Sequence, residues 1–209
     1  TGSTNPLQLA GAYAVLANGG LRVQPRLVQR ITRSNGEVVF EAAPVLLDET
    51  QRAIPARNAF LVSSLLQEVT RSGTAARAQA TLKRADLYGK TGTTDDVVDA
   101  WFAGYQPGLV AVVWVGYDSP RSLGSRASGS ALALPAWIEF MATALKNVPV
   151  AEVLPPDGVT QVDGEWRYTE WEEGGFVRNL GLDGETISPA LAVRPNAMPL
   201  PVPPATTPQ

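Results

Sequence analysis

The sequence contains no cysteine and no histidine among its 209 residues. These two absences exclude thiol chemistry, imidazole general bases and the commonest zinc ligands. Any catalysis must therefore use hydroxyls, lysines, carboxylates or backbone amides, and neither a cofactor nor a metal ion is expected. Because a chain without cysteine fits any redox compartment, this absence does not locate the protein.

The chain also lacks an excess of basic charge and a long hydrophobic run. Its net charge is -3 and its 17 lysine and arginine residues are scattered, so nucleic acid is not an expected partner. The longest uninterrupted apolar run, residues 109–115, is too short to span a bilayer, and the N-terminus has no signal peptide. Since the sequence starts without methionine and runs directly into a helical pattern, we expect a fragment of a longer protein.

Helix signals occur at three places in the chain. Asn5 and Pro6 have the pattern of an N-cap followed by a first helical residue, and this helix is expected to continue until Asn18-Gly19-Gly20. Residues 56–71 carry apolar side chains at three- and four-residue spacing and are followed by Ser72-Gly73, so a second helix is expected there. A third helix is expected over residues 135–146.

Strand signals predict one hairpin and one antiparallel sheet. Asn35-Gly36 separates two strand-like runs and is expected to supply the positive backbone angles of a tight turn. Residues 87–94, 100–106 and 109–117 are expected to form a three-stranded antiparallel meander. The last strand is apolar on both faces, as in a sheet covered by helices on each side. The predicted fold class is therefore α/β of the α+β type, with an antiparallel sheet covered by helices.

The character of the sequence changes after Pro149. Residues 148–188 are acidic and rich in turn residues, and Trp166 and Tyr168 alternate as in a strand, so a small β appendage is expected. From Pro189 the sequence is rich in proline and nearly uncharged, which predicts a flexible tail over residues 189–209. Residues 1–147 would then form the main domain.

The stretch GKTGTT at residues 89–94 is the strongest candidate for a functional site. Glycine weakens a strand interior and often marks a place where another molecule approaches the backbone closely. Here two glycines flank Lys90 and threonines follow. A glycine-rich turn, or a solvated lysine on an edge strand, is the simpler interpretation of the same letters.

Several motifs occur around GKTGTT in a fixed order: GTAARA (73–78), DAWFAGY (99–105), VWVGYD (113–118), Ser128-Gly129 and ALPAW (133–137). This order resembles the C-terminal half of the transpeptidase domain of class A, bifunctional penicillin-binding proteins, which carry Lys-Thr-Gly as their third active-site motif. PLQLAGAYAVLANGG (6–20) is similar to the helix that follows the second motif. The resemblance covers residues 1–147 and implies the transpeptidase fold shared by penicillin-binding proteins and β-lactamases.

The resemblance implies roles for individual residues of GKTGTT. Lys90 and Thr93 would be catalytic: Lys90 would place a positive charge beside the substrate carboxylate and a proton shuttle, and the Thr93 amide would form half of an oxyanion hole. Substrate would contact Thr91, Gly92, Thr93, Thr94 and Trp101. Trp101 fits a cleft wall and a core position equally well. Simple alternation along a strand places Lys90 and the threonines on opposite faces, so both can serve one site only at a twisted or open edge.

Two family motifs are missing. No serine in the chain has lysine three positions later, so the nucleophile and its base are absent and this chain alone is not expected to become acylated. Ser3-Thr4-Asn5 matches the second motif by letters, but a helix cap is the favoured interpretation of these residues. Both motifs are expected upstream, in another part of the same domain.

The function implied is that of a fragment of a peptidoglycan D,D-transpeptidase. Its partners would be peptide stems ending in D-Ala-D-Ala and β-lactam antibiotics, and the complete protein would also be a glycosyltransferase. It would lie on the periplasmic side, anchored in the inner membrane by an N-terminal segment. The alternatives are a D,D-carboxypeptidase or β-lactamase that uses water as acceptor, and a non-catalytic penicillin-binding or sensing module.

Overall fold

The computed structural model describes residues 3–45 and 48–172. The proline-rich tail and residues 173–188 of the acidic segment lie outside this part, so the flexibility expected of the tail stays a prediction. Among the described residues, no helix has the length and apolar character needed to cross a membrane.

The central element is a three-stranded antiparallel sheet, as expected. Its strands are β3 (Tyr88–Thr93), β4 (Ala100–Gln106) and β5 (Leu109–Val115), in the order β3-β4-β5. The predicted meander is therefore confirmed, and GKTGTT forms a strand instead of a glycine-rich turn. Within the described residues β3 has a strand partner on one side only, so one edge of β3 is open.

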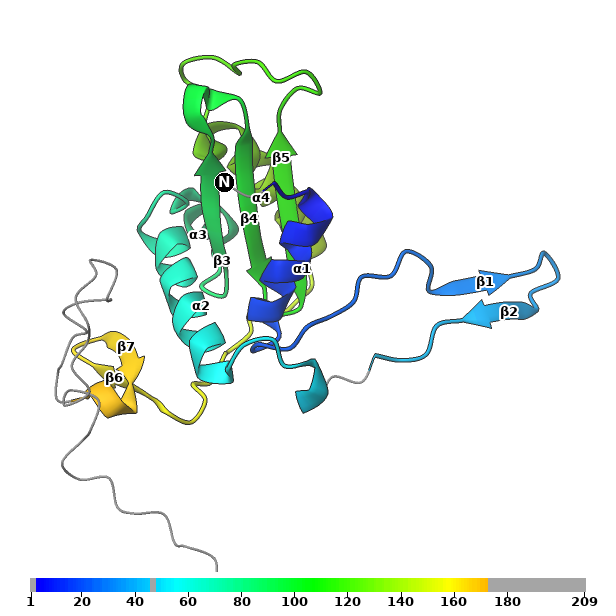
Figure 1. Ribbon diagram of the computed structural model, residues 1–209, viewed down its shortest axis with the longest axis horizontal. Helices are drawn as coiled ribbons and strands as arrows, with labels where there is room; N and C mark the ends of the chain where they lie inside the picture. The colour runs from blue at the N-terminus through cyan, green and yellow to red at the C-terminus, as the bar shows by residue number, and fades with distance from the viewer. Residues whose placement is uncertain (1–2, 46–47, 173–209) are drawn as a thin grey trace, which may run out of the picture. The chain divides into compact units, whose positions relative to one another are not determined.

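Helices cover both faces of this sheet (Figure 1). Helix α1 (Pro6–Ala17) contacts β4 and β5, helix α2 (Ala56–Arg71) contacts β3, and helix α4 (Leu134–Ala144) contacts β4 and β5 from the other face. The expected sandwich of helix, sheet and helix is confirmed. The short helices α3 (Arg77–Leu82) and η3 (Gly129–Ala133), the latter of π type, were not expected from the sequence.

The main core lies between the sheet and α4. Phe102 of β4 is fully buried, and its ring meets that of Trp137 at 4.9 Å between centroids. The Trp137 indole donates a hydrogen bond of 3.1 Å to the carbonyl of Ala111 in β5, so its polar atom is satisfied within the core. Phe102 is therefore a core residue, as expected.

The opposite face of the sheet carries a cluster of hydroxyl groups. Tyr105 of β4 stacks on Tyr88 of β3 with ring centroids 4.9 Å apart, and Tyr13 of α1 meets it edge-on. The Tyr105 hydroxyl is 2.6 Å from that of Ser63 in α2. Burial raises the pKa of Tyr105, so the phenol stays protonated and the pair is a neutral hydrogen bond.

The Asn35-Gly36 hairpin forms, but its turn differs from the expected one. Strands β1 (Arg30–Thr32) and β2 (Val38–Glu41) pair with a register shift. Of the two turn residues only Gly36 has a positive φ, at 85°. The Asn35 side chain instead accepts a hydrogen bond from the Glu37 amide at 3.0 Å. One left-handed glycine after a turn, with a bulge, is the usual geometry of a slightly longer hairpin loop.

The cap expected at the start of α1 is confirmed. The Asn5 side chain accepts from the Gln8 amide at 2.9 Å, and the Gln8 side chain accepts from the Asn5 amide at 3.2 Å. This reciprocal capping box satisfies two amides at the start of α1. Asn5 is therefore a helix cap in this structure, in agreement with the interpretation of Ser3-Thr4-Asn5 given above.

A second hairpin forms where the small β appendage is expected. Strands β6 (Val159–Val162) and β7 (Glu165–Tyr168) pair with each other, and Trp166 of β7 packs edge-on against Phe60 of α2 at 4.9 Å. The Tyr168 hydroxyl also donates to the Asn58 side chain at 3.0 Å. These contacts fix the hairpin to α2.

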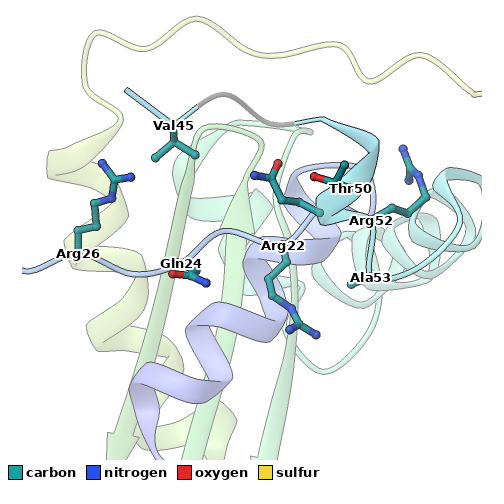
Figure 2. A pocket seen from close by; sticks show the side chains of 8 residues that line it. Arg22, Gln24, Arg26, Val45, Thr50, Arg52 and Ala53 are labelled. Atoms are coloured by element: carbon teal, nitrogen blue, oxygen red, sulfur yellow. The ribbon is translucent and has the colours of Figure 1, made fainter. Parts of the chain in front are cut away.

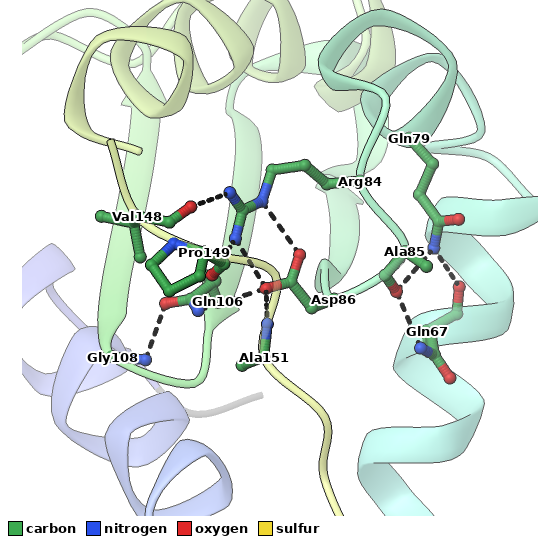
Figure 3. Close-up of polar contacts among 10 residues, drawn as sticks. All are labelled: Gln67, Gln79, Arg84, Ala85, Asp86, Gln106, Gly108, Val148, Pro149 and Ala151. Atoms are coloured by element: carbon green, nitrogen blue, oxygen red, sulfur yellow. Dashed lines mark hydrogen bonds and ion pairs between the residues drawn. The ribbon is translucent and has the colours of Figure 1, made fainter. Parts of the chain in front are cut away.

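A buried ion pair holds the segment that leads into β3 (Figure 3). Asp86 is almost fully buried and accepts two hydrogen bonds from the Arg84 guanidinium, at 2.9 and 2.7 Å. It also accepts from the Gln106 side chain at 3.2 Å and from the Ala151 amide at 2.8 Å. Arg84 donates in turn to the carbonyls of Val148 and Pro149. The network thus joins the start of β3, the end of β4 and residues 148–151.

Candidate active site on the open edge of β3

The residues of GKTGTT lie along the open edge of the sheet. Lys90, Thr93 and Thr94 are exposed, whereas Thr91 and Gly92 are partly buried. In the ladder Thr91 pairs with Phe102 and Gly92 pairs with Trp101. Thr91 therefore shares its face with the core residue Phe102, and Lys90 and Gly92 share the other face with Trp101.

Lys90 reaches over the edge to the side of the threonines. Its ammonium donates a hydrogen bond of 2.9 Å to the carbonyl of Thr91 and lies 3.4 Å from the Thr91 hydroxyl. Simple alternation along the strand placed Lys90 and the threonines on opposite faces. Because Lys90 lies at the open edge, its long side chain can bend around the strand to the face of the threonines. The charge and the hydroxyl groups can act on the same bound group.

The backbone of β3 also presents hydrogen-bonding groups to the edge. The Thr94 amide donates to the carbonyl of Asp99, the residue before β4, at 3.1 Å, so this bond continues the ladder between β3 and β4 by one residue pair. In an antiparallel ladder bonding alternates from one residue to the next. Thr91 and Thr93 consequently point their N–H and C=O groups away from β4. An extended peptide can add to such an edge as a further strand.

Thr93 is held by a contact from the segment that precedes α4. Its hydroxyl oxygen accepts a hydrogen bond of 3.1 Å from the Gly129 amide. A hydroxyl that accepts one bond still has its own proton to donate. The Gly129 contact therefore fixes the Thr93 oxygen and leaves its proton available to an acceptor at the edge.

Thr94 and Trp101 are placed differently from the other candidates. The Thr94 hydroxyl accepts from the Asp99 amide at 2.8 Å and closes the connection between β3 and β4. Trp101 is partly buried and lies 6.1 Å from the ring of Trp114, in a tilted arrangement. The Trp114 indole donates to the Asp99 carboxylate at 2.8 Å, so Asp99 has a local partner. A substrate contact of Thr94 or Trp101 stays a prediction.

Two residues outside GKTGTT, Thr74 and Gly129, complete the edge. The hydroxyls of Thr74 and Thr91 are 3.0 Å apart, although Thr74 belongs to the loop after α2. Gly129 approaches the paired residues Gly92 and Trp101. Both residues occur in short motifs that follow the family order, GTAARA and Ser128-Gly129, but nothing in those letters shows that they contact β3.

The described residues thus bring an ammonium, hydroxyls and outward amides together on one strand edge, a set suited to binding a carboxylate and an oxyanion. The family model of the penicillin binding protein transpeptidase domain matches residues 3–136. The chain belongs to this family.

The relatives of this chain are much longer than the chain itself. Penicillin-binding protein 1A of Neisseria flavescens is 42% identical over 189 residues, which cover 90% of this chain and 23% of that protein. The crystal structure of penicillin-binding protein 1A from Haemophilus influenzae matches with a TM-score of 0.68 and 31% identity, over 75% of this chain and 28% of that one. The D,D-transpeptidase domain of a peptidoglycan glycosyltransferase from Eggerthella lenta matches with a TM-score of 0.52 and 27% identity, over 68% and 33%. The chain thus spans less than a quarter of the Neisseria relative.

The open hollow drawn in Figure 2 lies away from β3 of this transpeptidase domain. It has a volume of about 540 Å³ and is lined by residues between α1 and α2: Arg22, Gln24, Arg26, Val45, Thr50, Gln51, Arg52 and Ala53. Arg52 pairs with Glu49 and donates to the carbonyls of Gly19 and Ile54, both at 3.1 Å. Arg26 donates to the carbonyl of Ala43. These two arginines therefore hold the connection between the helices together.

The approach of Gly129 to β3 gives a first prediction. A Cβ at this position would lie 2.6 Å from the Gly92 carbonyl oxygen and would also meet that of Trp101. We expect Gly129→Ala to lower the stability of the domain by about 1 to 3 kcal/mol, because the segment must move off the strand. Thermal unfolding measures this effect.

Gly11→Ala in α1 is the matched control, since a Cβ there meets nothing within 4 Å and alanine favours helix. Equal melting temperatures for Gly129→Ala and the parent would contradict the close approach.

Proposed function

We propose that the protein carrying this chain is a serine-type peptidoglycan D,D-transpeptidase. An upstream serine would attack the penultimate D-alanine of a stem peptide, release the terminal D-alanine and pass the acyl group to an amine on a neighbouring stem. β-Lactams resemble the D-Ala-D-Ala end and would acylate the same serine. This chain supplies the third motif, and the Ser-x-x-Lys and Ser-x-Asn motifs belong to the upstream part of the domain.

The observation that carries this proposal is the open edge of β3. A stem peptide that lies along this edge meets the outward N–H and C=O groups of Thr91 and Thr93. Its terminal carboxylate would accept from the Thr93 hydroxyl, with Lys90 close by. The Thr93 amide would stabilise the oxyanion of the tetrahedral intermediate together with a second amide from upstream. Gly92 adds no side chain that could obstruct the bound peptide.

The location and the second activity of the complete protein are proposed from the same family resemblance. We place it on the periplasmic side of the inner membrane, anchored through a segment outside this chain, and we assign it a second, glycosyltransferase activity. One of the matched structures is described as the transpeptidase domain of a peptidoglycan glycosyltransferase, which supports this pairing of activities.

The test uses the complete protein with a stem peptide ending in D-Ala-D-Ala and an amine acceptor. A transpeptidase releases D-alanine and joins the remaining peptide to the amine, which mass spectrometry detects. Hydrolysis without the joined product would support a carboxypeptidase. Labelling by a fluorescent penicillin without any release of D-alanine would support a binding module. The last two results would each overturn the proposal.

The Thr93 hydroxyl gives a second prediction. In the complete protein, Thr93→Val is expected to slow acylation by a fluorescent penicillin about tenfold to a hundredfold, because one hydrogen bond to a carboxylate is worth about 1.5 to 3 kcal/mol. Thr93→Ser keeps the acceptor for the Gly129 amide and the proton for the substrate, so it is expected to stay close to the parent rate. If Thr93→Val is folded and acylates as fast as the parent, Thr93 does not bind the carboxylate.

A further inference from the structure

Thr74 lies in a tight loop at the C-terminal end of α2. On one side the Gly73 amide donates to the Glu68 carbonyl at 3.2 Å, and on the other the Ala75 amide donates to the Val69 carbonyl at 3.1 Å. Ala75 is fully buried in the main core. The backbone on both sides of Thr74 is therefore fixed, while its own side chain is exposed and turned toward β3.

The Thr74 hydroxyl extends a chain of polar groups that begins at Lys90. The Lys90 ammonium lies 3.4 Å from the Thr91 hydroxyl, which lies 3.0 Å from the Thr74 hydroxyl. An ammonium can only donate hydrogen bonds, whereas a hydroxyl can donate and accept. Thr91 therefore accepts from Lys90, while either hydroxyl can donate in the hydrogen bond between Thr91 and Thr74. The Thr91 hydroxyl thus links the Lys90 ammonium to Thr74.

We propose that Thr74 is a positioning residue of the transpeptidase reaction, which orients the Thr91 hydroxyl so that Thr91 holds the Lys90 ammonium at the open edge of β3. This inference rests on the proposed function. With Thr74 in place, the Thr91 hydroxyl has a second partner that limits its rotation, and the ammonium has two acceptors on one residue, the hydroxyl and the carbonyl. Without Thr74 the Thr91 hydroxyl is free to rotate, and the position of the charge becomes less defined. Catalytic groups lose rate when their geometry loosens even slightly.

A purely structural role for Thr74 would give a different set of results. Neither Thr74 nor Thr91 is fully buried, so loss of their hydrogen bond leaves both hydroxyls accessible to water. The fold is consequently expected to tolerate Thr74→Val, which keeps the size of the side chain. If Thr74→Val loses activity at an unchanged melting temperature and Thr74→Ser keeps the activity, the reaction requires the hydroxyl of residue 74 and not only its size.

The experiment measures acylation of the complete protein by a fluorescent penicillin in Thr74→Val, Thr74→Ser, Thr91→Val and the double variant Thr74→Val/Thr91→Val. Rates over a range of penicillin concentrations separate the acylation rate constant from the apparent dissociation constant. We expect Thr74→Val to lower the rate constant about tenfold with little change in the dissociation constant, and Thr74→Ser to keep the parent rate. The double variant is expected to be no slower than Thr91→Val, because Thr74 acts only through the Thr91 hydroxyl, which Thr91→Val has already removed.

The possible outcomes separate this inference from the proposed function. Parent-like acylation by Thr74→Val, or additive effects of the two valine substitutions, overturns the role of Thr74. A Lys90→Ala variant is included in the same series. If Lys90→Ala acylates at the parent rate, the assignment of Lys90 fails whatever Thr74 does. If Thr74→Val does not fold, Thr74→Ala takes its place in the double variant.

Discussion

Acylation of the complete protein by a β-lactam is expected to fall about a hundredfold to a thousandfold when Lys90 is replaced by alanine. Removal of one preorganised group that stabilises developing charge typically has an effect of this size. Lys90 is exposed, and among residues 3–45 and 48–172 its ammonium hydrogen-bonds only to the carbonyl and hydroxyl of Thr91. No buried partner is left behind, so the melting temperature is expected to change little.

Lys146→Ala is the matched control for this prediction. Lys146 is also exposed, but it follows α4, outside the edge formed by β3. Its removal lowers the net charge by the same amount and is expected to leave the acylation rate unchanged. Acylation rates and melting temperatures are measured for both variants. Equal losses of rate in the two would indicate a general effect of charge instead of a site at Lys90.

Asp86→Ala is expected to destabilise the domain by about 3 to 5 kcal/mol, because it leaves a buried cation without its partner. The side chains of Arg84 and Asp86 are only 10% and 1% exposed, so water cannot replace the lost carboxylate. The Gln106 side chain and the Ala151 amide would lose their acceptor as well. For a domain of this size we expect a fall in melting temperature of roughly 10 °C. A fall of only a degree or two would contradict the network.

The exposed pair of Arg33 and Glu37 serves as the control. These side chains are 61% and 53% exposed at a distance of 2.7 Å. A surface pair of this kind contributes at most about 1 kcal/mol, so Glu37→Ala is expected to change the melting temperature little.

The ion pair also predicts how stability depends on pH. Burial acts to raise the pKa of Asp86, but hydrogen bonds from Arg84, Ala151 and Gln106 outweigh burial and hold the pKa below its usual value. A carboxylate with a lowered folded-state pKa stabilises the fold above its unfolded pKa of about 3.9. This contribution is present in full at neutral pH and is lost as pH falls below that value toward the folded pKa. The parent is therefore expected to lose more stability than Asp86→Asn on acidification through this range, as measured by thermal unfolding.

Local signals were sufficient to predict most elements of this domain. Asn5 with Pro6 marked the start of α1, and the spacing of apolar residues marked α2 at the bounds that the structure shows. GKTGTT could be assigned to an edge strand because a cation between two glycines does not suit a core strand. In each case the decisive interactions lie within a few residues of one another along the chain.

Other features depend on residues far apart in the sequence. Asp86 meets Gln106 and Ala151, and Gly129 meets Thr93, with no local pattern that specifies either contact. Helix α3 was missed because its first residue, Arg77, follows no capping side chain. The turn at Asn35-Gly36 was only partly right, because the same dipeptide fits two hairpin loops that differ by one residue.

The open edge of β3 has a consequence for the solubility of the protein. An unpaired strand edge is a template on which another chain can add, and proteins often prevent such association by placing lysine on the edge. Lys90 is the only charged residue in β3, and it sits at the middle of this strand. The residue that we propose to be catalytic thus also discourages the edge from joining a second molecule. A variant that replaces Lys90 by an apolar side chain would combine inactivity with a tendency to aggregate, whereas arginine at this position would keep the protection.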